Sequence, residues 1–219
     1  MVETSKIRLG ISIGDPNGIG FEIILKTFED KKIFDLLIPI VFANVENFIE
    51  QRQRLGIKTN IFSLKNIHKP EEGKLNIINT WNQPFPIIFG EVQKEAGKAS
   101  IRSLEAGTKA IKDRLIDVLV TAPINKKSIQ LNSFNFPGHT DYLNQELEGE
   151  SLMFMISDSI KIALVTDHIP LSQIINHLNK DVIEKKLNLL EKSLVYDFGI
   201  KKPRIAVLGI NPHAGDNGV

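Results

Sequence analysis

The stretch IRLGISIGDPNGIGFEIILKTF, residues 7–28, decides the fold class. Residues 7–13 are mostly apolar and β-branched and predict a buried strand. Residues 19–28 have the apolar pattern of a helix, and the glycine-rich segment 14–20 joins the two. A strand, a tight turn and a helix in this order are the first part of a βαβ unit, whose strands run parallel.

The same alternation continues along the chain. It predicts a helix over residues 44–54 and a loop over 80–90, which holds two prolines. Apolar residues on one face predict amphipathic helices over 101–115 and 183–198. Further strands are predicted at residues 37–43, 75–79, 118–121, 162–166 and 204–208. Strands alternating with helices indicate an α/β fold with a mostly parallel sheet flanked by helices. No strong linker marks a domain boundary.

Composition narrows the function. The 219 residues suggest one large domain or two small ones at roughly 100–200 residues per domain. The net charge is +1, which does not favour nucleic acid as a partner. The sequence holds no cysteine, so a metal ion would have to be bound by histidine and carboxylate. No apolar stretch approaches the length of a membrane span, and no signal peptide is evident, so we expect a cytoplasmic protein.

The C-terminal residues follow a predicted strand closely and have no helix after them. A βα connection without its helix would leave that strand poorly covered. We therefore expect the chain to be truncated.

Two candidate sites follow predicted strands. Residues 14–20 could approach a ligand closely through their glycines, or could be a structural turn, and they match neither the dinucleotide fingerprint nor a P-loop. Residues 121–126 lie at the carboxyl end of a strand, where α/β sheets bind ligands. Lys126 there is a weak catalytic candidate, and a solvated lysine at a helix start is the alternative.

Histidines mark three further segments. His139 and Thr140 lie in a loop, where an imidazole and a hydroxyl could hold a phosphate, although for this segment taken alone a surface histidine is the better interpretation. His168 and His213 each follow a predicted strand, and in a parallel sheet such ends share one edge. They could be two ligands of a divalent ion, or two hydrogen-bonded histidines. His68 and His177 are interpreted as surface residues.

Taken together, these segments resemble the 4-hydroxythreonine-4-phosphate dehydrogenase family of pyridoxal phosphate biosynthesis. The matching stretches occur in the family's order and span nearly the whole chain. They are GDPNGIGFEI (14–23), VTAPINK (120–126), FPGHTDYL (136–143), ALVTDHIPL (163–171) and LGINPHAGDNG (208–218).

The resemblance implies a fold like that of isocitrate and isopropylmalate dehydrogenases, with two interleaved subdomains and a homodimer. It implies that His139 and Thr140 bind the phosphorylated substrate and that His168 and His213 bind the metal. A third metal histidine and further substrate-binding residues would lie in a C-terminal segment that this sequence does not contain. Asp216 stands where many relatives have glutamate.

The resemblance also implies NAD or NADP and one divalent ion (Zn, Mg or Co) as cofactors. The substrate, a small phosphorylated hydroxy-amino acid, would be oxidised at its secondary alcohol to a β-keto acid, which would then lose carbon dioxide. No residue of this sequence can be assigned to the nicotinamide cofactor. We expect the 219-residue chain itself to be inactive.

Two other functions stay open. A paralogue could oxidise a different phosphorylated hydroxy acid with the same N-terminal motifs. A non-catalytic protein could use residues 14–20 and 121–126 to bind a phosphate-containing ligand without any metal.

Overall fold

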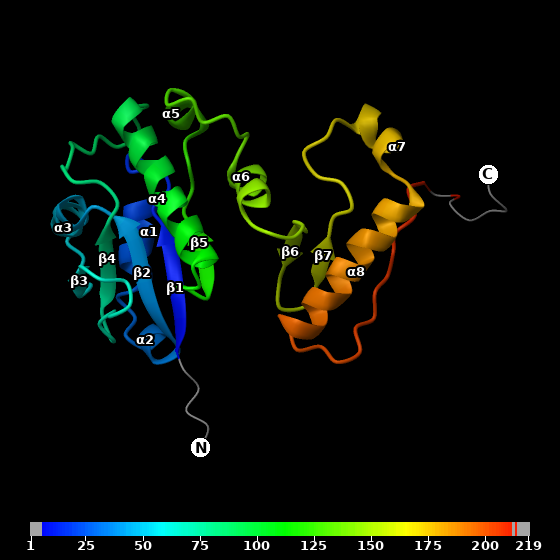
Figure 1. The fold of residues 1–219 in the computed structure, drawn as a ribbon, viewed down its shortest axis with the longest axis horizontal. Coiled ribbons are helices and arrows are strands. Elements are labelled where there is room, and N and C mark those ends of the chain that lie inside the picture. The colour runs from blue at the N-terminus through cyan, green and yellow to red at the C-terminus, as the bar shows by residue number, and fades with distance from the viewer. Residues whose placement is uncertain (1–5, 212, 214–219) are drawn as a thin grey trace, which may run out of the picture. The chain divides into compact units, whose positions relative to one another are not determined.

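The computed structural model describes residues 6–211 and 213, and the chain divides into two compact units (Figure 1). Unit 1 is Met1–Gly149 and unit 2 is Glu150–Val219. The interleaving of two subdomains stays a prediction. No helix of the described residues is both long and apolar enough to span a membrane.

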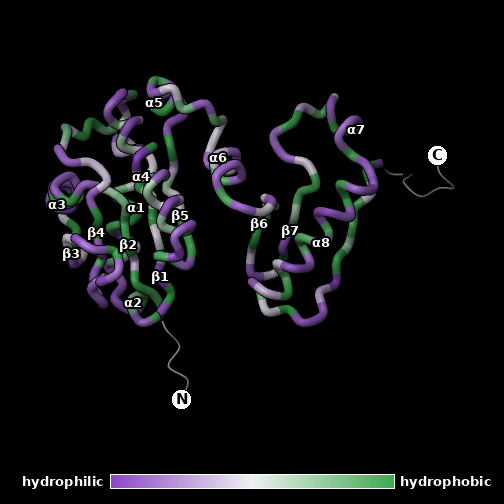
Figure 2. The backbone as a smooth tube through the Cα atoms, viewed as in Figure 1, coloured by the Kyte–Doolittle hydropathy of each residue, from purple (hydrophilic) through white to green (hydrophobic). Residues whose placement is uncertain are grey.

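Unit 1 is built on a five-stranded sheet in which every strand pair is parallel. The strand order is β3-β4-β2-β1-β5. The strands are β1 (Ile7–Ser12), β2 (Leu37–Ala43), β3 (Ile61–Leu64), β4 (Leu75–Asn79) and β5 (Val118–Thr121). The predicted α/β fold with a mostly parallel sheet is therefore confirmed, whereas β3 was missed. In Figure 2, hydrophobic residues recur along these strands, as expected where both faces of a sheet are covered.

The helices of unit 1 cover both faces of this sheet. Alternate residues of β2 point to opposite faces, so Val41 and Ala43 join one apolar cluster and Ile40 and Phe42 another. The first cluster includes residues of α1 (Gly20–Thr27) and α3 (Val45–Arg54), and α2 (Ile33–Leu36) adds Phe34. The second includes Ala110 of α4 (Lys94–Lys112), the long helix that contacts β1, β2 and β5.

Helix α4 approaches the sheet closely because small residues line its buried face. A Cβ added to Gly107 would lie 2.7 Å from a methyl carbon of Leu119, and one added to Gly97 would lie 2.0 Å from the Ser128 carbonyl oxygen. The close approach lets the fully buried Ser103 hydroxyl bridge β2 and the residue that follows β1. Its oxygen accepts from Ile13 N at 3.0 Å and donates to Phe42 O at 2.5 Å.

Two shorter helices follow β5. Helix α5 (Lys126–Gln130) begins after Asn125, whose side-chain oxygen accepts from the backbone N–H groups of Lys127 and Ser128. Helix α6 (His139–Glu146) follows the loop after α5.

Unit 2 contains a two-stranded antiparallel sheet, β6 (Phe154–Ile156) and β7 (Lys161–Ala163). The 3-10 helix Leu171–Gln173, α7 (Ile174–His177) and α8 (Lys180–Tyr196) follow. The Phe154 and Phe198 rings lie 5.9 Å apart, which packs the hairpin against the residues after α8.

Two predicted strands of unit 2 need correction. The strand predicted at residues 162–166 is the shorter β7, and its pairing is antiparallel. Residues 204–208 form no strand, and Leu208 is 91% exposed. Local β-propensity suggested a strand there, but a strand also needs a neighbour for its backbone hydrogen bonds, and the described chain provides none at this segment.

The Ser103 bridge predicts the effect of removing one hydroxyl. Ser103→Ala leaves Ile13 N–H and Phe42 C=O unpaired in the core, so we expect the free energy of unfolding to fall by about 1–3 kcal/mol. Urea denaturation measures this change, with the exposed Ser63→Ala as the matched control. Equal urea midpoints for the two variants would contradict the role given to Ser103.

Candidate functional site

The first two candidate segments meet at the carboxyl edge of the sheet. Strands β1 and β5 are neighbours, with Ser12 opposite Thr121, and the loops that follow them are bonded to each other. Asp15 N donates to Pro123 O at 2.8 Å. A Cβ added to Gly14, whose φ is +66°, would lie 2.2 Å from the same oxygen. Only glycine therefore fits at residue 14, and the two loops form one rigid surface.

The side chain of Asn17 holds the turn 14–20 in place through hydrogen bonds. It is 1% exposed, and its side chain ties the turn to the loop before α4. The amide nitrogen donates to Glu91 O and to Gln93 Oε1, both at 3.0 Å, and the amide oxygen accepts from Ile88 N at 3.0 Å. Three partners satisfy most of the hydrogen-bonding capacity of this carboxamide. Asn17 therefore has a structural role in the turn. The sequence pattern did not predict these three hydrogen bonds.

Asp15 differs from its neighbours in this turn. Its side chain is buried, and Oδ1 accepts from Asn17 N at 3.1 Å. Burial raises the pKa of the Asp15 carboxyl above its usual value, and the bond from Asn17 offsets part of that rise. The carboxylate therefore stands at the ligand-binding edge of the sheet with little compensation for its lost hydration.

Lys126 is the first residue of α5 and is exposed. It makes no hydrogen bond or ion pair within the described part of the chain. Its catalytic role stays a prediction.

His139 and Thr140 are placed at the beginning of α6, in unit 1. Helix α6 contacts α4 through an ion pair between Glu146 and Lys112 at 2.6 Å. The Tyr142 ring also lies 5.5 Å from Phe134 and 5.3 Å from Phe136. These contacts fix the start of α6 on unit 1.

The His139 ring is partly buried, and its Nε2 is a buried atom without a hydrogen-bond partner. Burial lowers the pKa of this imidazole below its ordinary 6.5, so the ring is neutral near pH 7. No side chain caps the N-terminus of α6, where the residue before the helix is Gly138. The first N–H groups of the helix and the unpaired ring nitrogen together could hold an anion.

The two predicted metal ligands both belong to unit 2. His168 is exposed and has a left-handed backbone, with φ of 53°, and His213 is also exposed. The predicted reason for their convergence, two parallel strands ending at one edge, is wrong because residues 204–208 are no strand and β7 pairs antiparallel. The residues on either side of His213 in the chain, 212 and 214, lie outside the described residues.

Within residues 6–211 and 213, no group of three or more histidines or carboxylates could hold a metal ion. Imidazole nitrogens are suitable ligands for a divalent ion, but the described residues do not complete a site. His68 and His177 are exposed, as predicted, and His177 Nδ1 lies 2.9 Å from Gln173 O.

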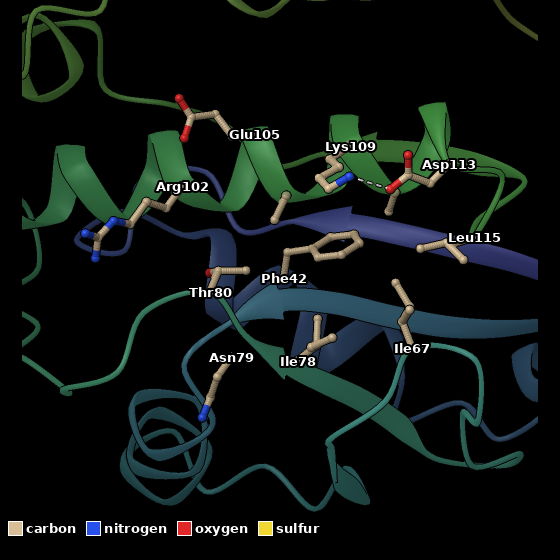
Figure 3. A pocket seen from close by; sticks show the side chains of 12 residues that line it. Phe42, Ile67, Ile78, Asn79, Thr80, Arg102, Glu105, Lys109, Asp113 and Leu115 are labelled. Atoms are coloured by element: carbon tan, nitrogen blue, oxygen red, sulfur yellow. Dashed lines mark hydrogen bonds and ion pairs between the residues drawn. The ribbon is translucent and has the colours of Figure 1, made fainter.

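Two grooves border α4, and sequence reasoning missed both. The first, of about 440 Å³, has an apolar floor that includes Phe42 and Ile78 and a charged rim that includes Arg102, Glu105 and Lys109 (Figure 3). Burial raises the pKa of Glu105 on this rim. The second, of about 700 Å³, lies between α4 and residues 80–85. None of the predicted substrate- or metal-binding residues lines either groove.

The parallel sheet with helices on both faces places unit 1 in the α/β class, and comparisons with known proteins specify the family. Residues 35–219 match the family described as pyridoxal phosphate biosynthetic protein PdxA. A 4-hydroxythreonine-4-phosphate dehydrogenase from Bacteroides thetaiotaomicron is 40% identical over 220 aligned residues, covering 100% of this chain and 60% of that relative. The chain belongs to the PdxA family.

Other relatives and solved structures agree. A D-threonate 4-phosphate dehydrogenase from Cupriavidus necator is 32% identical, over 96% of this chain and 64% of that protein. A crystal structure of a 4-hydroxythreonine-4-phosphate dehydrogenase from Burkholderia phymatum superposes with a TM-score of 0.84 at 26% identity, covering 98% of this chain and 66% of that one. This chain therefore spans less than two thirds of the curated relatives' length.

The burial of His139 predicts a pH effect on stability. Burial lowers the pKa of His139 below 6.5 in the folded chain, so the unfolded chain binds the proton more readily. Protonation of His139 therefore does not reduce the free energy of unfolding above pH 6.5. It reduces that free energy as the pH falls from 6.5 to the lower pKa of the folded chain. Urea denaturation from about pH 5 to about pH 8 spans the ordinary histidine pKa. Over this range the free energy of unfolding of His139→Gln should depend less on pH than that of the wild type. The matched control is His68→Gln, which replaces an exposed histidine of the same unit. Identical acid dependence in His139→Gln and the wild type would refute the burial effect.

Proposed function

We propose that this chain is part of an enzyme that oxidises 4-phosphohydroxy-L-threonine with NAD or NADP and a divalent metal ion, in pyridoxal phosphate biosynthesis. The PdxA family match and the relatives named for this dehydrogenase support the assignment. The observation in unit 1 that carries it is the start of α6, where a neutral His139 has an unpaired, buried ring nitrogen beside an uncapped helix N-terminus.

In this proposal the start of α6 binds the substrate phosphate. The N–H groups at the helix N-terminus and the Thr140 hydroxyl can donate to phosphate oxygens. His139 can donate from Nε2 when the neutral ring carries its proton there. The ion pair of Glu146 with Lys112 of α4, and the packing of Tyr142 on Phe134 and Phe136, hold these donors in place, so little entropy is lost when the ligand binds.

The reaction removes a hydride from the secondary alcohol β to the carboxylate and transfers it to the nicotinamide, while the hydroxyl proton leaves to a base. Lys126 is our weak candidate for a proton-transfer role. The β-keto acid then loses carbon dioxide to give 3-amino-2-oxopropyl phosphate. His168 and His213 are the proposed metal ligands, and a bound ion would lower the pKa of the alcohol and stabilise the enolate. We also propose a cytoplasmic homodimer.

A second substrate has direct support from the comparisons. The Cupriavidus necator relative is named for D-threonate 4-phosphate, which carries a hydroxyl where 4-phosphohydroxythreonine carries an amine. We therefore propose D-threonate 4-phosphate as the alternative substrate.

A chimera tests the proposed function. Because this chain aligns with 60% of the Bacteroides thetaiotaomicron relative, it can replace that part of the relative's sequence. We expect the chimera, supplied with divalent ion, to reduce NAD or NADP with 4-phosphohydroxythreonine, and the 219-residue chain alone to be inactive. Substituting His168→Ala or His213→Ala should lower turnover by about 100-fold or more if each binds the metal.

The matched control in the chimera is His68→Ala, a histidine on the surface of unit 1, which should keep full activity. Faster turnover of D-threonate 4-phosphate would favour the alternative substrate. A folded chimera that oxidises neither compound, or that keeps its activity without His168 and His213, would contradict the proposal.

A further inference from the structure

Asp15 is a buried carboxylate with one hydrogen bond. The residue is 7% exposed, and Oδ1 accepts from Asn17 N at 3.1 Å. The second oxygen, Oδ2, makes no hydrogen bond within the described residues. An ionised carboxylate can accept about four hydrogen bonds, so most of the capacity of Asp15 is unused.

The charge of Asp15 opposes folding. A buried carboxylate loses hydration, and the raised pKa of Asp15 has this burial as its main cause. Asparagine could keep the bond from Asn17 N, because its amide oxygen accepts equally well, and it would carry no charge. The hydrogen bond from Asn17 N therefore does not require the negative charge.

Asp117 shows how the same side chain behaves when its role is structural. It lies just before β5, at the opposite edge of the sheet, and accepts from Arg8 N at 2.8 Å and from Arg8 Nη2 at 2.9 Å. These bonds lower the pKa of the Asp117 carboxyl. Asp15 has no cationic partner of this kind among the described residues.

The position of Asp15 suits a ligand. It follows β1 at the carboxyl edge, where the β1 and β5 loops meet. Its own N–H is bonded to Pro123 O, and the next turn is fixed by the three hydrogen bonds of Asn17. The carboxylate is held rigidly before any ligand arrives, which lowers the entropy lost on binding.

We propose that Asp15 is a ligand-binding residue whose carboxylate accepts hydrogen bonds from N–H or O–H groups of a polar ligand. The choice of ligand rests on the proposed function. Two groups would supply such donors: the ammonium group of the phosphorylated hydroxy-amino acid, and the ribose hydroxyls of the nicotinamide cofactor. Either would replace the hydration that the carboxylate loses on folding.

The test is Asp15→Asn in the 219-residue chain. Because the substitution removes a buried charge and keeps the turn, we expect Tm to rise by about 2–4 °C. We also expect weaker binding of one probe, by about 10- to 100-fold, in calorimetric titrations with NAD and with 4-phosphohydroxythreonine. The probe that loses affinity identifies the source of the donor groups.

Asp117→Asn is the matched control, since the same substitution there breaks the pair with Arg8 and should lower Tm without changing the affinity for either probe. A lower Tm for Asp15→Asn, unchanged affinity for both probes, or no binding of either probe by the wild type would each overturn the proposal. Tm and affinity are measured without turnover, so they test the role of Asp15 alone. The dehydrogenase activity is tested separately, by turnover of the chimera.

Discussion

The rest of unit 1 depends on the hydrogen bonds of one buried hydroxyl, that of Ser103. At Ile13 the chain leaves β1, and its N–H needs a partner that the sheet no longer supplies. Ser103 accepts this bond and donates to Phe42 O of β2, so α4 is joined to β2 and to the start of the loop after β1. The bridge requires a small residue at 103 and close packing of α4, which Gly107 permits.

From this anchor, the carboxyl edge is assembled by the chain itself. The bond from Asp15 N to Pro123 O joins the β1 and β5 loops, and Asn17 joins the β1 loop to the segment before α4. Most polar groups of these loops are satisfied internally. The Asp15 carboxylate accepts only one hydrogen bond within the described residues, and the His139 ring nitrogen is buried without a partner, as are the Ser12 and Ser128 hydroxyls. Such polar groups are the ones that a ligand can complete.

Sequence patterns predicted β2 and β4 with their bounds, because strands covered on both faces are continuous apolar runs. They also predicted the edge strand β5, whose four residues are apolar or β-branched. They missed β3, a short edge strand, and wrongly predicted one at residues 204–208, because pairing depends on neighbours that local sequence does not specify. The edge loops 14–20 and 121–126 could be predicted from their place after strands. The roles of Ser103 and Asn17 could not, since each is defined only by tertiary contacts. The metal-binding role of His168 and His213 still rests on the family resemblance.

We infer that the carboxyl edge of unit 1 is already formed in the absence of ligand. Amide hydrogen exchange of Ile13 and Asp15 in the ligand-free chain tests it most directly, because neither N–H belongs to a strand and each has one specific acceptor. We expect both amides to exchange as slowly as those within β1. Exchange of either amide at the rate of an unstructured peptide would contradict a preformed edge.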